Sequence, residues 1–398
     1  MSDIPEGYKM SELGVIPSDW NVKTFGEVMT GFSSGATPYR GRSEYYKGKI
    51  RWITSGELNY NVITDTIEKI TENAVRNTNL KIHPKGTFLM AITGLEAEGT
   101  RGSCGIVGAE ATTNQSCMAL FPTKELLTEY LFHYYVNYGN SLALEYCQGT
   151  KQQSYTAKIV KILPIIVPPT IEEQQAIASA LSDVDALISA LEQLITKKRN
   201  IKQGAMQQLL PGKKRLPGFS GEWDVKKIKN ISSITTGAKN TQDKIDDAEY
   251  PFFVRSSIVE RINSYSFDGE AVLTAGDGVG TGKVFHYING KFDFHQRVYK
   301  ISDFCEKIDG YFFYLFFSNY FLKRIMAMTA KSSVDSVRME MIAEMPIPLP
   351  PLPEQQAIAQ ILSDMDSEIE TMEQKQAKYK AIKQGMMQEL LTGKMRLV

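Results

Sequence analysis

Residues 275–287 read AGDGVGTGKVFHY, and four glycines followed by Lys283 give this stretch the composition of a phosphate-binding loop. A Walker-type loop needs Gly, four residues and then Gly-Lys-Ser/Thr, at the start of a helix whose free amides meet the anion. Counting back from Lys283, the first glycine position holds Asp277, and Val284 stands where a hydroxyl should bind magnesium. The GxGxxG spacing fails as well, and the residues that follow predict a strand. The sequence therefore argues against nucleotide binding.

The sequence also lacks the residue patterns of other catalytic sites and of metal sites. The four cysteines include no CxxC pair and only four histidines are present, so neither a zinc site nor a disulfide framework is indicated. His286 and His295 fall on neighbouring predicted strands without a placed carboxylate, so we expect them to pack or hydrogen-bond. No Asn/Asp-Pro-Pro-Tyr/Phe tetrapeptide of the amino-methyltransferases occurs, and the single Glu-x-Lys, at residues 373–375, falls inside a predicted helix. We predict no catalytic residue, no metal ligand and no cofactor-binding residue in this chain.

Charge and length bound the class of protein. The chain has 398 residues, enough for two or three domains, and 45 basic residues balance 45 acidic ones. A net charge of zero removes the simplest argument for a nucleic-acid ligand, although it leaves room for a local basic surface. The N-terminus has no apolar signal region and no apolar run approaches 18 residues, so we expect the cytoplasm and no membrane.

Any functional site must be positioned by helices and strands. The most informative sequence feature about their arrangement is an internal repeat. Residues 173–216 and 354–397 align without a gap, and roughly 26 of about 44 positions are identical. The preceding stretches also match, LPIIVPP at 163–169 and MPIPLPP at 345–351. The repeat therefore includes a Pro-rich lead-in and a long segment that begins with EQQAIA.

The rest of the chain repeats more loosely. WNVK at 20–23 resembles WDVK at 223–226, and each is followed by a short stretch that ends in Ser34-Gly35 or Thr236-Gly237. Asn114-Gln115 falls opposite His295-Gln296. The chain is thus two copies of one plan, in which a variable domain of about 150 residues precedes a similar segment.

The two similar segments are predicted to be long helices. Apolar residues step by four and three along both, which is the seam of a coiled coil; they are Ile177, Leu181, Val184, Ile188, Leu191 and Ile195, then Ile358, Leu362, Met365, Ile369 and Met372. The Pro-rich lead-ins set each start, and Pro211-Gly212 and Gly393 set the ends. Placed antiparallel, two helices of about 57 Å would form a rigid strut with a variable domain at each end. Two unrelated amphipathic surface helices are the alternative.

The variable domains read as short strands with a helix near the end of each. The predicted strands of the first are Thr87–Ile92, Cys104–Val107 and Met118–Phe121. In the second, Glu270–Thr274 is a strand, and Val284–Ile288 and Lys291–Phe294 are predicted to form a hairpin through a type I′ turn at Asn289-Gly290.

The chain resembles the specificity subunit of type I restriction–modification enzymes. The resemblance is carried by two divergent domains, each followed by a Pro-Pro…EQQAIA…L…D helix that closes in Gln-(x)-Leu-Leu-x-Gly-Lys, and by the openings GVIPSDW and SSGATP. It implies an α+β fold with two mixed α/β target recognition domains, separated by two long antiparallel helices in a coiled-coil strut with a pseudo-two-fold internal repeat. The implied boundaries are 1–165 and 213–347 for the recognition domains, and 166–212 and 348–398 for the helical repeats.

The resemblance also implies a function. Each recognition domain would read one half of a split, asymmetric site in double-stranded DNA, and the helices would fix the gap and bind two modification subunits. Those subunits would use S-adenosylmethionine to methylate adenine at N6, and motor-nuclease subunits would use ATP and Mg²⁺. A coiled-coil scaffold that presents two protein-binding modules is the alternative.

Candidate DNA-binding residues are polar side chains on the predicted loops, because base edges are read by such groups while phosphate contacts set the register. The run GTKQQSYTAK at 149–158 is a plausible major-groove reader, since Gln can bind adenine through two hydrogen bonds. The glycines of the 275–287 stretch are interpreted as allowing close backbone approach to DNA, with Lys283 on a phosphate or guanine. The candidates of the first domain are Arg51, Thr54, Ser55, Thr93, Arg101, Asn114, Gln115, Lys151, Gln152, Gln153, Ser154 and Tyr155. Those of the second are Arg255, Ser256, Ser257, Asp277, Lys283, His295, Gln296, Arg297, Lys331, Ser332 and Ser333.

Overall fold

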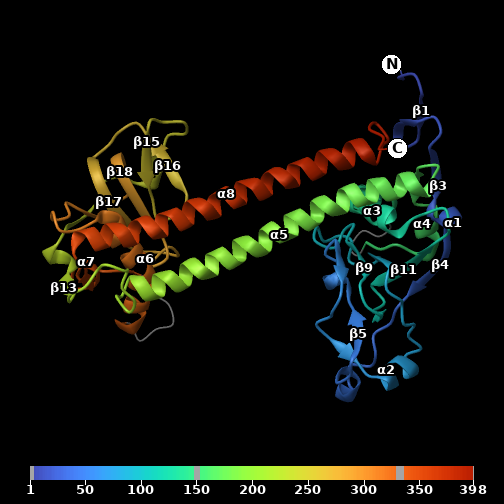
Figure 1. Ribbon diagram of the computed structural model, residues 1–398, viewed down its shortest axis with the longest axis horizontal. Helices are drawn as coiled ribbons and strands as arrows, with labels where there is room; N and C mark the ends of the chain where they lie inside the picture. The colour runs from blue at the N-terminus through green and yellow to red at the C-terminus, as the bar shows by residue number, and fades with distance from the viewer. Residues whose placement is uncertain (1–3, 148–152, 329–335, 398) are drawn as a thin grey trace. The chain divides into compact units, whose positions relative to one another are not determined.

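The computed structural model describes residues 4–147, 153–328 and 336–397 (Figure 1). The chain divides into two compact units. Unit 1 consists of Met1–Leu191 with Lys375–Val398, and unit 2 consists of Glu192–Gln374. Both are mixed α/β, as the sequence predicted. Each unit includes part of both long helices, so the predicted boundaries of the recognition domains remain a proposal.

Unit 1 is built on a five-stranded sheet of order β4-β11-β8-β9-β6, in which only the β6–β9 pairing is parallel. Its strands are β4 (Met29–Ser34), β6 (Asn61–Ile63), β8 (Phe88–Ala91), β9 (Cys104–Val107) and β11 (Cys117–Pro122). Helix α3 (Thr128–Tyr146) packs on β8 and β9, and it buries four aromatic side chains, those of Tyr130, Phe132, Tyr134 and Tyr135. The three predicted strands of this domain are confirmed.

Smaller elements complete unit 1. A second sheet has the order β10-β5-β7, with β10 (Ala111–Thr113), β5 (Ile50–Ile53) and β7 (Lys69–Ile70). The remaining elements are β1 (Tyr8–Ser11), β2 (Gly14–Pro17), β3 (Asn21–Thr24), α1 (Phe25–Val28), α2 (Glu72–Asn77), α4 (Ala157–Ile162) and β12 (Pro164–Val167).

Unit 2 contains a six-stranded sheet of order β14-β19-β17-β18-β15-β16, and helix α6 (Gly310–Met328) packs on β17 and β18 (Figure 1). The strands are β14 (Ser233–Thr236), β15 (Tyr250–Phe253), β16 (Val259–Ile262), β17 (Phe267–Ala275), β18 (Phe285–Phe294) and β19 (Val298–Ser302). The other elements are β13 (Asp224–Lys227), α7 (Met339–Ala343) and β20 (Pro346–Leu349).

The predicted type I′ hairpin at Asn289-Gly290 is wrong. Strand β18 runs through both residues, because β17 supplies a ladder partner on either side of them, from Phe267 opposite Phe292 to Thr274 opposite Phe285. Gly290 lies opposite Gly269, with φ of 145° and 146°, values that glycine tolerates. The hairpin is formed instead by β17 and β18, and the glycine-rich loop at 276–284 is its connection.

The Pro-rich lead-ins are strands. β12 pairs with β3 and β20 pairs with β13, each in a two-stranded antiparallel ladder. Proline lacks the backbone N–H donor. It is tolerated in an edge strand at positions where that N–H would face away from the paired strand. The weak repeat of WNVK and WDVK now has a structural reason, since β3 and β13 are the partners of the two lead-ins.

The two similar segments are helices α5 (Ile171–Leu209) and α8 (Leu352–Leu390), each of 39 residues. Gly212 and Gly393 follow them with φ of 71° and 70°, and their amides donate to Leu209 and Leu390. Left-handed glycines of this kind satisfy the last carbonyls of a helix. The predicted helix ends are confirmed.

Within each unit the two helices pair antiparallel. In unit 1, Ile177 and Leu181 of α5 share a core with Met387 and Leu390 of α8, and Lys383 Nζ lies 2.6 Å from Asp185 Oδ1. In unit 2, Lys198 Nζ lies 2.6 Å from Glu368 Oε1, and Lys202 pairs with Asp366, the repeat counterpart of Asp185. Most predicted seam residues are buried, while Val184, Ile188, Met365 and Met372 are half-buried. The alternative of unrelated surface helices is therefore wrong.

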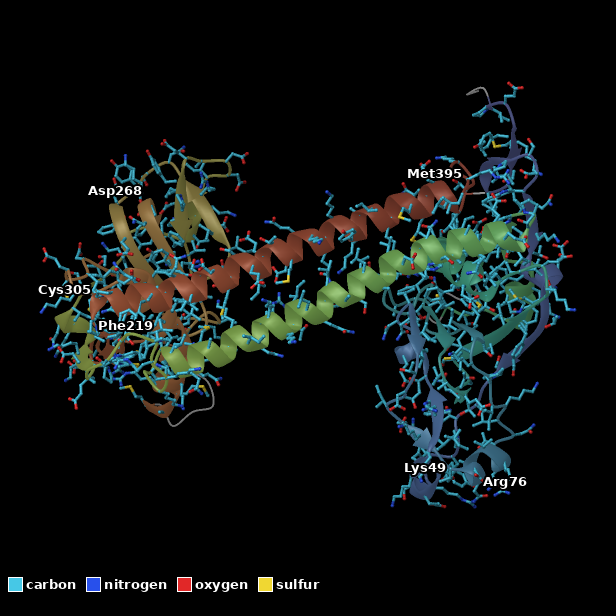
Figure 2. All side chains as sticks on the ribbon, viewed as in Figure 1. Lys49, Arg76, Phe219, Asp268, Cys305 and Met395 are labelled. Carbon is cyan, nitrogen blue, oxygen red and sulfur yellow. The ribbon has the colours of Figure 1, made fainter. Side chains whose placement is uncertain are left out.

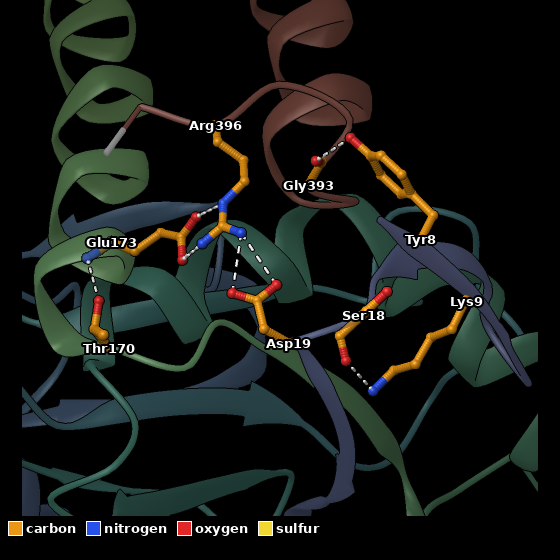
Figure 3. A network of polar contacts seen from close by, with 8 residues as sticks. All are labelled: Tyr8, Lys9, Ser18, Asp19, Thr170, Glu173, Gly393 and Arg396. Carbon is orange, nitrogen blue, oxygen red and sulfur yellow. Dashed lines mark hydrogen bonds and ion pairs between the residues drawn. The ribbon is translucent and has the colours of Figure 1, made fainter. Parts of the chain in front are cut away.

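Each unit is closed by an ion pair that sequence reasoning missed. In unit 1, Arg396 donates two hydrogen bonds of 2.7 and 2.8 Å to the buried carboxylate of Glu173, at the start of α5, and two more of 3.0 Å to Asp19 (Figure 3). Tyr8 donates to the carbonyl of Gly393 beside it. In unit 2, Arg215 donates two bonds of 2.6 Å to the buried Glu354.

These pairs follow the repeat. Glu173 and Glu354 are the first residues of the two EQQAIA stretches, and Arg215 and Arg396 are the last arginines of the two repeats. The end of each repeat therefore closes against the start of the other one.

Candidate nucleic-acid interface

In each unit, several loops that connect the strands lie close together at one edge of the main sheet. In unit 1, Gly35 follows β4 and touches the backbone of Thr113, at the turn between β10 and β11. A Cβ on Gly35 would lie 1.9 Å from Thr113 O. In unit 2, Gly237 follows β14 and touches Phe294, at the turn between β18 and β19, at the same 1.9 Å. The weak repeat of Ser34-Gly35 and Thr236-Gly237 therefore marks a common junction.

Matching backbone hydrogen bonds show that the two edges have one construction. Asn114 N donates to Ile53 O at 2.9 Å in unit 1, and His295 N donates to Phe253 O at 2.9 Å in unit 2. Isolated bridges join Thr93 to Ser154 and Asp277 to Ser336.

A second set of bonds fixes the same register. Ile92 N donates to Ser116 O in unit 1, and Gly276 N donates to Arg297 O in unit 2. The positions that correspond, unit 1 first, are Ser55 and Arg255, Thr93 and Asp277, Asn114 and His295, Gln115 and Gln296, and Ser116 and Arg297. We call the two sets cluster 1 and cluster 2.

Cluster 1 is uncharged. Gln115 is exposed, and its Oε1 accepts a hydrogen bond of 2.5 Å from Thr37 Oγ1, which leaves the amide NH₂ of Gln115 as a donor. Thr93 and Ser55 are half-buried beside it. Asn114 holds the turn, since its Oδ1 accepts from Ser116 N at 3.0 Å. The arrangement presents an amide and hydroxyls, the groups that read base edges without charge.

Several candidates of the first domain have structural partners. Arg101 donates to the carbonyls of Leu95 and Glu96 and so holds the loop after β8. Thr54 forms a capping box with Glu57. Arg51 is on β5, and its Nε lies 3.5 Å from Asp65 Oδ1.

Tyr155 requires a correction. It is only 3% exposed and belongs to the core, where burial raises the pKa of its hydroxyl. The reason is that Tyr155 N donates to Ile92 O, which draws the residue in behind the edge of the sheet.

The polar run at 149–158 is only partly described. Gln153 lies against the loop after β8, where its backbone N–H donates to Glu96 Oε2 at 2.9 Å. The backbone of Ser154 forms an isolated bridge with that of Thr93. The run therefore reaches cluster 1. Candidates that lie outside the described residues are Lys151, Gln152, Lys331, Ser332 and Ser333.

Cluster 2 is charged. Arg255 Nη1 donates to Asp277 Oδ1 at 3.0 Å, and Arg297 Nε lies 3.7 Å from Asp277 Oδ2. His295 is buried beneath them and its Nδ1 accepts from Arg297 N at 2.9 Å. Burial lowers the pKa of His295, and the nearby Arg255 lowers it further, so the ring is neutral at pH 7. Gln296 is exposed and donates to Asn240 Oδ1.

A hollow of about 560 Å³ opens at this edge of unit 2. Its lining residues are Thr236, Gly237, Gly276, Asp277, Gln296, Arg297, Tyr299, Ser336 and Val337. Ser256, Ser257 and Lys283 are exposed. Ser256 O receives a hydrogen bond from His286, so both histidines have the packing and hydrogen-bonding roles expected of them.

The glycines of the 276–284 loop require a correction. A Cβ on Gly276 would lie 2.9 Å from Arg297 O, one on Gly280 would lie 2.3 Å from Arg255 O, and one on Gly282 would lie 2.6 Å from Ile325. These three glycines therefore let the loop pack against its own unit. Gly278, with φ of 78°, is the member of the four whose added Cβ meets nothing closer than 3.9 Å.

Sequence reasoning missed four residues at these edges: Thr37, Asn240, Tyr299 and Ser336. Thr37 and Asn240 lie two and three residues after the junction glycines, so the weak repeat at SSGATP was the available signal. Tyr299 donates to Val337 O and Ser336 bridges Asp277, contacts that depend on distant chain segments.

Metal and membrane chemistry gain no support. Across residues 4–147, 153–328 and 336–397, no group of three His, Cys, Asp or Glu side chains could hold a metal ion. All four cysteines are free; Cys305 is exposed (Figure 2), and burial raises the pKa of Cys104 and Cys117. Among the described helices, none is both long and apolar enough to cross a membrane.

Comparisons with known proteins match almost the whole chain to the specificity subunits of type I restriction–modification systems. A family model described as type I restriction modification DNA specificity domain matches twice, at residues 17–203 and 220–381. The chain is 24% identical to the type I restriction enzyme MjaVIII specificity subunit of Methanocaldococcus jannaschii over 96% of this chain and 94% of the relative. It is 30% identical to the MjaIX specificity subunit of the same organism over 67% of this chain and 65% of that one.

A solved structure has the same fold. The crystal structure of a type I restriction–modification S subunit from M. genitalium matches 96% of this chain and 97% of its own length, with a TM-score of 0.66 and 15% identity.

Proposed function

The chain belongs to the family of type I restriction–modification DNA specificity subunits, and we propose that clusters 1 and 2 each read one half of a split DNA site. Two copies of the specificity domain occur in one chain. Members of this family supply recognition and not catalysis, so the chemistry belongs to other subunits of the complex.

One observation carries this proposal. Matching backbone hydrogen bonds at Asn114 and Ser116, and at His295 and Arg297, align five positions of the two units. Gln occupies one of them in both units, but the other four hold Ser, Thr, Asn and Ser in cluster 1 and Arg, Asp, His and Arg in cluster 2. A requirement of the fold would select similar residues at equivalent positions. Different polar groups on one framework suit two readers of different base sequences, because base edges are told apart by their pattern of donors and acceptors.

The long helices supply the partner surface of the proposed complex. On α5, Leu194 and Ile201 are about two-fifths and half exposed and lie seven residues apart, on one face of the helix. Side chains project outward along the middle of both helices in Figure 2. We propose that this face binds the modification subunits, two per chain, and that the helices set the gap between the half-sites.

The partners would bring the cofactors. S-adenosylmethionine would bind to the modification subunits, and ATP with Mg²⁺ to the motor-nuclease subunits, since this chain offers no phosphate loop and no cluster of metal ligands among its described residues. The proposed compartment is the cytoplasm.

We expect this chain alone to bind DNA weakly and to bind tightly together with the modification subunit. The physical reason is its net charge of zero, because phosphate neutralisation by Lys and Arg supplies most of the non-specific affinity of a protein for DNA. Mobility-shift titrations at several salt concentrations check this, with and without the partner.

The same complex tests the function itself. Selection from random duplexes should yield one split motif. Affinity that is equal with and without the partner and insensitive to salt, or selection of no motif by the complex, would contradict the proposal.

A further inference from the structure

We propose that Arg297 reads a guanine in the half-site of unit 2, and that Asp277 is the positioning residue that fixes the direction of its guanidinium. This inference rests on the proposed DNA-reading function and adds a base to it. It assigns to Asp277 a role different from a direct contact with DNA.

The carboxylate of Asp277 is engaged on both sides. Its Oδ1 accepts from Arg255 at 3.0 Å and its Oδ2 lies 3.7 Å from Arg297 Nε. An acidic group at a surface that meets phosphates is repelled by them unless it accepts from a cytosine amine or neutralises a cation. With both oxygens facing arginines, Asp277 is suited to the second role.

The geometry leaves the outer end of Arg297 available. Its contact with Asp277 uses Nε, so both terminal NH₂ groups remain to donate in parallel. The side chain is 64% exposed, against 46% for Arg255, and it is one of the residues that line the 560 Å³ hollow. Two parallel N–H donors match the O6 and N7 acceptors of guanine in the major groove. The ion pair at Nε, with 3.7 Å between Arg297 Nε and Asp277 Oδ2, favours one direction of the guanidinium, so the side chain loses less conformational freedom when it binds.

Cluster 1 serves as an internal control for this reasoning. Ser55, Thr93 and Ser116 occupy the positions of Arg255, Asp277 and Arg297, and matching backbone hydrogen bonds and bridges fix the same register in both clusters. The framework therefore forms without the three charges. Since the fold does not need them, the arginines and their carboxylate are explained by what unit 2 binds.

The experiment uses the full chain in complex with its modification subunit, and a duplex library in which the half-site of unit 2 is randomised. Wild type should select a motif that contains a guanine. We expect Arg297→Ala and Arg297→Lys to lose preference for that guanine by about 10- to 100-fold, because lysine keeps the charge without the fork. Asp277→Asn should weaken the same preference by a smaller factor. Every other position of both half-sites should keep its base.

Lys291→Ala is the matched control, since it removes one exposed positive charge from unit 2 outside cluster 2. It should leave the preferences unchanged. Loss of affinity for all sequences alike in the Arg297 variants would mean a phosphate contact, and an unchanged profile would mean no contact; either result overturns the inference. If the wild-type complex selects no motif at all, the proposed function itself fails.

Discussion

Substituting alanine for Gly237 is expected to lower the free energy of unfolding by about 3 kcal/mol and to abolish recognition of the half-site of unit 2. The added Cβ would lie 1.9 Å from Phe294 O, a contact with backbone that no side-chain rotation relieves. Strand β14 or the 295–297 turn must move, and the turn holds His295, Gln296 and Arg297. Urea unfolding measures the stability, and hydrogen exchange should show faster exchange in β14 and β19.

Unit 1 offers the twin of this substitution. Gly35→Ala meets Thr113 O at the same 1.9 Å and should perturb β4, β11 and the other half-site. Gly385→Ala is the control, because nothing lies within 4 Å of its added Cβ inside helix α8. Alanine there should be neutral or should stabilise by about 0.5–1 kcal/mol. Equal effects of Gly237→Ala and Gly385→Ala would contradict the assigned junction.

Replacing Arg396 with alanine is expected to cost about 2 kcal/mol of unfolding free energy. Removing one partner of a fully buried pair costs about 3–5 kcal/mol, and the exposure of about a third of the Arg396 side chain reduces this through solvent screening. The loss arises because the carboxyl group of Glu173, which is 1% exposed, is left buried without the guanidinium that donates two hydrogen bonds to it. Chemical denaturation gives the size, and limited proteolysis should show a C-terminal segment released from unit 1.

Two further variants separate the ion pair from charge in general. Arg396→Lys keeps the charge without the double hydrogen bond and should fall between wild type and alanine. Arg199→Ala breaks an exposed pair with Glu373 and should cost under about 0.5 kcal/mol. If Arg396→Ala is as mild as Arg199→Ala, the closing role given to the C-terminal arginine is wrong.

Regular sequence patterns were enough to predict the two long helices and several strands of the sheets. Apolar steps of four and three predicted α5 and α8, and Gly212 and Gly393 marked their ends. Strand β9 was predicted to the residue. These features depend on local sequence, so a single chain contains the information for them.

What depended on distant partners was missed or misread. Asn289-Gly290 has the local signature of a turn, but β17 pairs with the strand on both sides of it and keeps it extended. The lead-ins were predicted to set the helix starts, and the helices do begin just after them at Ile171 and Leu352, but the pairing of the lead-ins with β3 and β13 as strands was not predicted. Arg396 and Glu173 lie 223 positions apart, and nothing in their local sequence predicts their contact.

The candidate site shows the same division. Polar loop residues could be named from the sequence, and exposed Gln115, Gln296 and Arg297 lie at the two edges. Which of them point outward could not be known, because it depends on packing: Tyr155 turns into the core, and Arg101 folds back onto its own loop. The three close-packed glycines of the 276–284 loop show that such a run can serve the chain's own backbone contacts.

The most direct test exchanges residues 217–345 for the matching segment of a related specificity subunit and maps the methylated sequence in cells that carry the modification subunit. The account predicts that one half of the split site changes to that of the donor, while the other half stays as it was. A site in which neither half changes, or in which both change together, would contradict the claim that each unit reads one half.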